Sequence, residues 1–172
     1  SRKSEIMSMM PVYRDFIKKH FEKNEDHVYL ISAADKKLKS MIEKYFDTEK
    51  LPIMIAEESM RDFLSISSLS IVTSGTATLE ASILECPPVI CYKTSSFNYS
   101  IISRMLKIDD VGLPNLLLGK RYYMELIQNE CNVENILDAV RKTEELIPYS
   151  SENASLIKDI IKGNGYSEAI KV

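Results

Sequence analysis

Apolar and polar positions along the chain form short blocks that change period several times. From residue 6 to residue 21, apolar side chains recur with helical spacing. Short apolar runs then cover 28–31, 53–55, 69–72 and 89–92, and helical patterns lie between and after them. Apolar runs that alternate with helical segments are typical of a parallel sheet with helices on both faces. The pattern therefore predicts an α/β, Rossmann-like fold.

The same kind of spacing predicts the other helices. They are expected at 35–46, 59–66, 77–84, 96–106, 123–128, 133–147 and 151–162. By contrast, 111–121 is expected to be a loop because glycine and proline interrupt its apolar residues. A chain of 172 residues suits one domain with a real core. We expect a single domain over 1–172, in which 148–172 forms a C-terminal helical extension.

The first candidate site is the junction of the 69–72 strand with the 77–84 helix. Ser74, Gly75 and Thr76 form a turn there, and a helix N-terminus attracts anions through its unpaired N–H groups and its dipole. The Thr78 hydroxyl adds a donor, and the Glu80 carboxylate can accept hydrogen bonds from a ribose. The alternative is a plain helix cap, in which Ser74 or Thr76 is the N-cap and Glu80 completes a capping box.

The second candidate site is the expected loop at 111–121. The Asn115 amide can hydrogen bond to a sugar or a phosphate, and Lys120 and Arg121 can neutralise a diphosphate. In the alternative, Asn115 satisfies its own backbone turn and both cations are simply solvated.

Composition narrows the function classes. A net charge of -3 with a pI near 5.5 argues against nucleic acid as the main partner. The cysteines show no CxxC spacing and are expected to be reduced and buried. His20 and His27 are interpreted as structural, and neither the histidines nor the acidic residues show metal-ligand spacing. No apolar run is long enough to span a bilayer.

Two motifs carry a resemblance to a known family. The segments SGTATLEASILECPPVICYK at 74–93 and GLPNLLLGKRYYMELIQNEC at 112–131 resemble the C-terminal half of lipid-A-disaccharide synthases. SRKSEI at 1–6 is similar to the loop after the first strand of that half. The resemblance implies one half of a GT-B fold, with a missing N-terminal domain. It also implies an inverting hexosyltransferase that joins UDP-2,3-diacylglucosamine to 2,3-diacylglucosamine 1-phosphate and releases UDP.

The resemblance also implies roles for single residues. Arg2 would reach the diphosphate and Glu80 the ribose, while the turn of Ser74 to Thr76 would cradle the phosphates. Asn115 would face the catalytic cleft. Lys120 stands where the family usually has arginine, with Arg121 beside it. The general base would belong to the missing domain, so this chain alone is expected to be inactive, and no cofactor or metal is expected.

The family is peripheral on the cytoplasmic face of the inner membrane of Gram-negative bacteria, which implies the same place for this chain. A candidate membrane-facing stripe comprises Phe97, Tyr99, Ile101, Arg104 and Lys107, although such stripes are commonly core. Two alternatives stay open. One is another two-domain UDP-sugar enzyme, such as a 2-epimerase. The other is a flavodoxin-like binding module, for which Asp109-Asp110 is the only nearby acidic pair.

Overall fold

The computed structural model describes residues 2–47, 50–73, 75–93 and 110–164. Its helices are α1 (Lys3–Phe21), α2 (Lys36–Glu43), α3 (Met60–Ile66), α4 (Thr76–Ile83), α6 (Leu113–Leu118), α7 (Val133–Glu144) and α8 (Ser150–Asp159). Its strands are β1 (Tyr29–Ala33), β2 (Ile53–Glu57), β3 (Ser70–Thr73), β4 (Pro88–Tyr92) and β5 (Glu125–Ile127). Short turns of other helix types cover Gln128–Glu130, Ile147–Tyr149 and Ile160–Asn164. Ser74, the expected 96–106 helix with its membrane-facing stripe, and Asp109 lie outside the described residues.

Every strand pair among the described residues is parallel. β1 pairs with β2 from Tyr29 opposite Ile53 to Ala33 opposite Glu57. β3, β4 and β5 form a second sheet in that order, with β4 in the centre. This confirms the α/β, Rossmann-like class. Because the strands of a parallel sheet run the same way, their carboxyl ends share one edge, where ligands of such folds bind.

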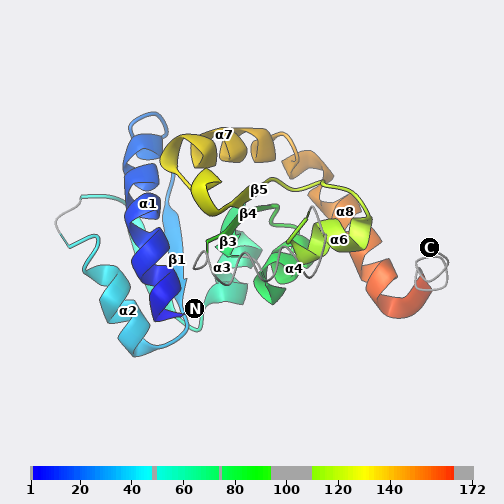
Figure 1. Ribbon diagram of the computed structural model, residues 1–172, viewed down its shortest axis with the longest axis horizontal. Coiled ribbons are helices and arrows are strands. Elements are labelled where there is room, and N and C mark those ends of the chain that lie inside the picture. The colour runs from blue at the N-terminus through cyan, green and yellow to red at the C-terminus, as the bar shows by residue number, and fades with distance from the viewer. Residues whose placement is uncertain (1, 48–49, 74, 94–109, 165–172) are drawn as a thin grey trace.

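Helices cover both faces of the second sheet (Figure 1). α7 packs against β4 and against α1, and α4 packs against β3, β4, α6 and α8. The side chains of β4 alternate accordingly. Val89 and Cys91 join a core shared with α1 and α7, whereas Ile90 joins Tyr123 and Ile157 on the other face. Within the range 148–172, where a helical extension is expected, the described residues include α8, which packs against α4 and α6.

Residues 111–121, expected as a loop, include the helix α6. The prediction was wrong because Pro114 lies in the first turn of α6, where a missing N–H costs nothing. Gly119 then ends the helix with a φ of 63°, a left-handed conformation that favours glycine. Both residues therefore mark the ends of a short helix, which residue propensities alone predict to be a loop.

The helix expected at 123–128 was also wrong. The structure places the strand β5 there, paired with Ile90–Tyr92 of β4. A strand of three residues is too short to show an alternating pattern. Its conformation is set by pairing with β4, which is a contact distant in sequence.

Candidate functional site

The turn between β3 and α4 lies open at the carboxyl edge of the second sheet. Gly75 is the N-cap residue of α4, and its φ of 145° with a ψ of -163° belongs to a region that only glycine adopts without strain. Both Gly75 and Thr76 are exposed, and among the described residues a Cβ on Gly75 would meet no atom within 4 Å beyond its chain neighbours. The turn therefore needs glycine for its backbone conformation, and no described side chain fills the space next to Gly75.

Thr78 supports this turn from inside. Its side chain is fully buried, and its Oγ1 donates a hydrogen bond to the Gly75 carbonyl oxygen at 2.7 Å. The Thr78 carbonyl oxygen in turn accepts from Ser82 Oγ at 2.9 Å. The expectation that the Thr78 hydroxyl faces a ligand is therefore corrected, because a buried hydroxyl committed to Gly75 holds the turn in shape.

Glu80 lies one turn further along α4 and is partly exposed. Within the described part of the chain, its carboxylate makes no hydrogen bond or ion pair. Its carboxylate oxygens are therefore available to an external donor, as the ribose role requires. The α4 helix thus presents an open glycine turn and, one turn later, an available carboxylate.

Asn115 does not face a cleft. It is fully buried in α6, and its amide nitrogen donates to the Tyr123 carbonyl oxygen at 2.8 Å and to Glu125 Oε1 at 2.7 Å. Its amide oxygen accepts from the backbone N–H groups of Tyr122 at 2.9 Å and Tyr123 at 2.8 Å. An asparagine amide has two donor hydrogens and two acceptor lone pairs, and all four are used here. Its expected catalytic role is therefore corrected to a structural one, which the alternative interpretation of its own turn had in part foreseen.

Glu125 is the partner that sequence reasoning missed. This buried carboxylate accepts from the backbone N–H groups of Val111 at 2.7 Å and Gly112 at 3.0 Å, besides the Asn115 amide. Together, Glu125 and Asn115 fix both ends of the segment that enters and leaves α6. The one signal in the sequence was an acidic residue between the apolar Met124 and Leu126.

The two cations after α6 have separate surroundings. Lys120 Nζ lies 5.5 Å from the centre of the Tyr122 ring, a cation–π contact. Arg121 Nε forms an ion pair with Asp110 Oδ1 at 2.6 Å. In the described part of the chain, no hydrogen bond or ion pair joins either cation to the Gly75 turn.

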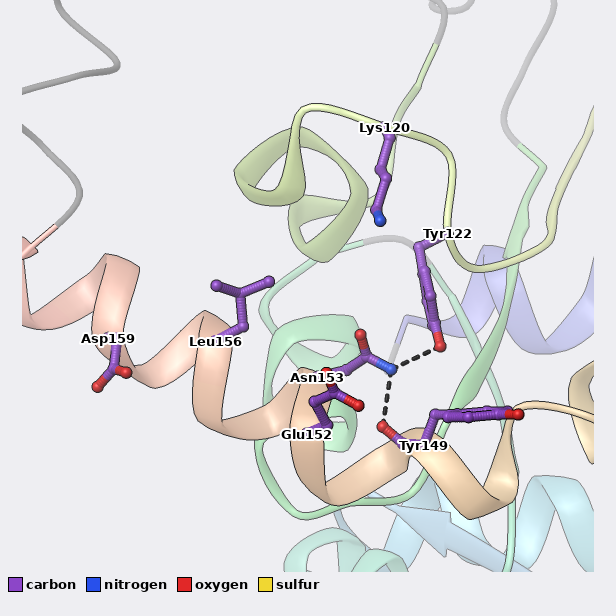
Figure 2. A pocket seen from close by; sticks show the side chains of 7 residues that line it. All are labelled: Lys120, Tyr122, Tyr149, Glu152, Asn153, Leu156 and Asp159. Carbon is purple, nitrogen blue, oxygen red and sulfur yellow. Dashed lines mark hydrogen bonds between the residues drawn. The ribbon is translucent and has the colours of Figure 1, made fainter.

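Lys120 also lines a hollow of about 450 Å³ shared with α8. Figure 2 shows its ammonium pointing toward Asn153, whose amide nitrogen donates to Tyr122 Oη at 2.6 Å and to the Tyr149 carbonyl oxygen at 2.8 Å. These bonds tie α8 to the residues that follow α6. Lys120 is exposed and long, so its charge is not fixed to one position in this hollow.

Arg2 stands at the N-cap of α1 and is exposed. Its backbone N–H donates to Glu5 Oε2 at 3.1 Å, which closes the first turn of α1. The guanidinium is therefore carried at the start of a helix whose first turn is stabilised locally. The structure does not bring Arg2 into hydrogen-bond or ion-pair contact with the described residues of the Gly75 turn.

The histidines and cysteines have structural surroundings. His20 Nδ1 lies 2.8 Å from Tyr29 Oη, and its ring packs edge-on against that of His27. All three cysteines are buried. Among the residues that the structure describes, no group of three or more histidine, cysteine or acidic side chains is placed to hold a metal ion. No helix in that part of the chain is long and apolar enough to cross a membrane.

Comparisons with known proteins agree with this architecture. A family model described as lipid-A-disaccharide synthetase matches residues 1–162. The lipid-A-disaccharide synthase of Alteromonas mediterranea is 33% identical over 162 residues, which cover 91% of this chain and 41% of that protein. The synthase of Wigglesworthia glossinidia brevipalpis is 41% identical over 101 residues, which cover 55% of this chain and 26% of that protein. The synthase of Neisseria meningitidis serogroup C is 34% identical over 143 residues, which cover 81% of this chain and 37% of that protein.

The chain spans about two fifths of the length of several curated relatives that it matches. The match covers the Gly75 turn, α6 and β5, and the relatives share one name. The chain therefore belongs to the lipid-A-disaccharide synthetase family.

Proposed function

We propose that this chain is the nucleotide-sugar-binding half of an inverting glycosyltransferase that makes lipid A disaccharide 1-phosphate. Its substrates are UDP-2,3-diacylglucosamine and 2,3-diacylglucosamine 1-phosphate, and UDP is released. The observation that carries the proposal is the open Gly75 turn at the carboxyl edge of a parallel sheet, in a chain of this family.

The diphosphate of UDP binds at the β3–α4 turn. Backbone N–H groups at the start of α4 donate to phosphate oxygens, and the helix dipole favours their negative charge. Gly75 permits close approach, and Ser74 and Thr76 add hydroxyl donors. Glu80 accepts from the ribose hydroxyls, since its carboxylate has no other described partner. This binding mode uses no metal.

Positive charge for the diphosphate comes from Arg2, Lys120 and Arg121. Arg121 is already paired with Asp110, so part of its charge is neutralised where it stands. Among the described residues, the Lys120 ammonium has only a ring contact, and its stem is exposed and flexible, so the ammonium can turn toward an anion. We therefore expect Lys120 to contribute more than Arg121 to UDP binding.

Catalysis needs residues outside this chain. Asn115 is buried with its amide fully used, so it positions α6 and touches no substrate. The general base that takes the acceptor hydroxyl proton is assigned to the N-terminal domain. A leaving diphosphate held without that base does not complete the transfer, so the chain alone binds UDP and does not turn over. The whole enzyme works peripherally on the cytoplasmic face of the inner membrane.

Calorimetric titration of the chain with UDP and with ADP tests this proposal. We expect saturable UDP binding with little for ADP. Gly75→Val should abolish binding, because its side chain blocks the turn and strains the backbone. Gly163→Val is the matched control, since Gly163 also has a positive φ of 91° with open space, far along the chain in the turn after α8. A Gly75→Val variant that binds UDP normally would contradict the proposal.

A further inference from the structure

A lysine-rich hollow of about 780 Å³ lies along α2, away from the residues that follow α6. Its lysines are Lys3 at the start of α1 and Lys36, Lys37 and Lys44 in and just after α2, and all four are exposed. Figure 1 shows α2 at the outer edge of the molecule, on the opposite side from α8. The lysines of the hollow are therefore exposed at an outer edge of the described chain.

The positive charge of this hollow is not balanced by the described residues. None of its four lysines forms an ion pair there, and the one carboxylate in the lining, Asp35, accepts the Leu38 backbone N–H at 2.8 Å as the N-cap of α2. Three other described lysines do form ion pairs: Lys19 with Glu134, Lys39 with Glu43 on the same helix, and Lys142 with Asp138. The four lysines of the hollow thus gather positive charge on one surface of a chain whose net charge is -3.

Two lysines of the cluster also work against the helix that carries them. Lys36 and Lys37 occupy the first turn of α2, which contains no acidic residue. The positive end of the helix dipole lies at that turn, so cations there are unfavourable. A stabilising sequence would place acidic residues at these positions. Lys36 and Lys37 are therefore explained better by an external anion than by the stability of α2, whereas Lys44 at the C-cap suits the negative end of the helix dipole.

The lining indicates what kind of anion fits. Leu38 and Met41 lie among the lysines and remain partly exposed, so the hollow is amphipathic. Lysine is a flexible point charge without the fixed fork of arginine, which suits many headgroups better than one oriented phosphate. Clusters of four or more basic residues on an amphipathic helix bind anionic lipid. We infer that Lys3, Lys36, Lys37 and Lys44 form a docking surface for an anionic bilayer.

Vesicle co-sedimentation at low and at physiological salt tests this surface. The chain should bind vesicles of phosphatidylcholine mixed with phosphatidylglycerol, and it should not bind phosphatidylcholine alone. Binding should weaken as salt is raised, because charges farther apart than about 8 Å are screened at physiological ionic strength. The triple variant Lys36→Gln/Lys37→Gln/Lys44→Gln should lose affinity on the order of 100-fold, at roughly tenfold or less per lysine.

The matched control is Lys23→Gln/Lys50→Gln/Lys162→Gln. It removes the same charge from exposed lysines, two of which lie before the amino ends of β1 and β2. The control should keep most of the affinity. Equal loss in both triple variants would mean that net charge alone drives binding, and unchanged binding of the first variant would exclude the surface. Either result, or no binding by the parent chain, overturns the inference.

Free UDP and the rest of the longer protein are the competing occupants. If UDP displaces the chain from vesicles, or if the first triple variant loses UDP affinity, the lysines belong to the nucleotide site and the bilayer inference fails. If the full-length enzyme ignores the anionic vesicles that this chain binds, an acidic segment of the longer protein covers the hollow, which also overturns it. Membrane docking here does not require UDP binding, so the two proposals fail separately.

Discussion

In the three-stranded sheet, β4 buries all of its residues except Tyr92, whereas in the two-stranded sheet β1 buries only Ala33. The difference follows from their neighbours. β4 has a strand on each side and helices over both faces, while β1 pairs with β2 alone among the described residues. The same contrast extends to the polar groups. Around β5 a carboxylate and an amide are buried and fully bonded, but along α2 Lys36, Lys37 and Lys44 are exposed and form no ion pair with a described residue.

The contrast indicates that one region of the molecule is built for rigidity and the other for contact with other molecules. Buried polar groups are costly unless every one is paired, so the Glu125–Asn115 network fixes α6 and β5 in one arrangement. The exposed lysines of the α2 hollow have little effect on stability, and their charge stays available to other molecules. The region around the three-stranded sheet therefore supplies the scaffold of the proposed UDP site, and the region around the two-stranded sheet supplies the proposed membrane surface.

The largest expected effect is at Glu125. Glu125→Ala removes an acceptor of the partly buried Val111 N–H, of the buried Gly112 N–H and of the buried Asn115 amide, so three hydrogen bonds are lost. We expect a loss of about 3–5 kcal/mol in the free energy of unfolding, measured by urea denaturation. Glu57→Ala in β2 is the control from the other sheet. Glu57 is exposed, so its loss should stay within about 0.5 kcal/mol.

Asn115→Ala should cost about 2–4 kcal/mol of stability, because it removes four hydrogen bonds that join a buried amide to Tyr122, Tyr123 and Glu125. The exposed Asn129→Ala is its control. In the folded fraction, the affinity for UDP should fall much less than the stability does. Normal stability together with lost UDP binding would restore the direct role that the family resemblance implied for Asn115.

Glu80→Ala should weaken UDP binding by about 1–3 kcal/mol, as expected for a charge-assisted hydrogen bond to the ribose. Its stability should be close to that of the parent, since the carboxylate has no described partner. Glu85→Ala, just beyond α4, is a control with the same charge change. Calorimetry that finds equal affinities for both variants would exclude the ribose role.

The smallest expected effect is a pH dependence of stability that arises from His20, next to the two-stranded sheet. Burial, with His27 nearby, lowers the pKa of His20 below its ordinary value of 6.5, against a smaller opposing effect of Glu144. The unfolded chain then binds the proton more readily than the folded one, so stability falls as pH drops below about 6.5 and is unaffected above it. Urea midpoints between about pH 5 and pH 7 should show this fall in the parent chain and less of it in His20→Gln. Identical slopes would contradict the assignment.

Sequence patterns predicted the parts of the fold that local spacing controls. The order of strands and helices from α1 to β4 follows from runs and periods that each segment carries itself. The strand β5 was not predicted because three residues are too few to show a period. The helix α6 was not predicted because its proline and glycine, which mark its ends, favoured a loop. Both elements depend on contacts between segments distant in sequence.

The candidate site shows the same limit. The Gly75 turn could be recognised because a strand, a glycine and a helix follow one another in the sequence. Residue type alone does not tell whether a polar side chain points to a ligand or into the core. Thr78 and Asn115 point inward, where their hydrogen bonds hold the turn and α6. The buried role of Glu125 depends on backbone N–H groups more than ten residues away.

The most direct test of the central claim is to map the backbone amide signals of the ¹⁵N-labelled chain by NMR while UDP is added. If UDP binds at the β3–α4 turn, saturable shifts should be concentrated at Gly75, Thr76 and the first turn of α4, with little change at Lys36 and Lys37 on α2. Saturable shifts that leave Gly75 and Thr76 unmoved while other residues respond would place UDP elsewhere and contradict binding at this turn.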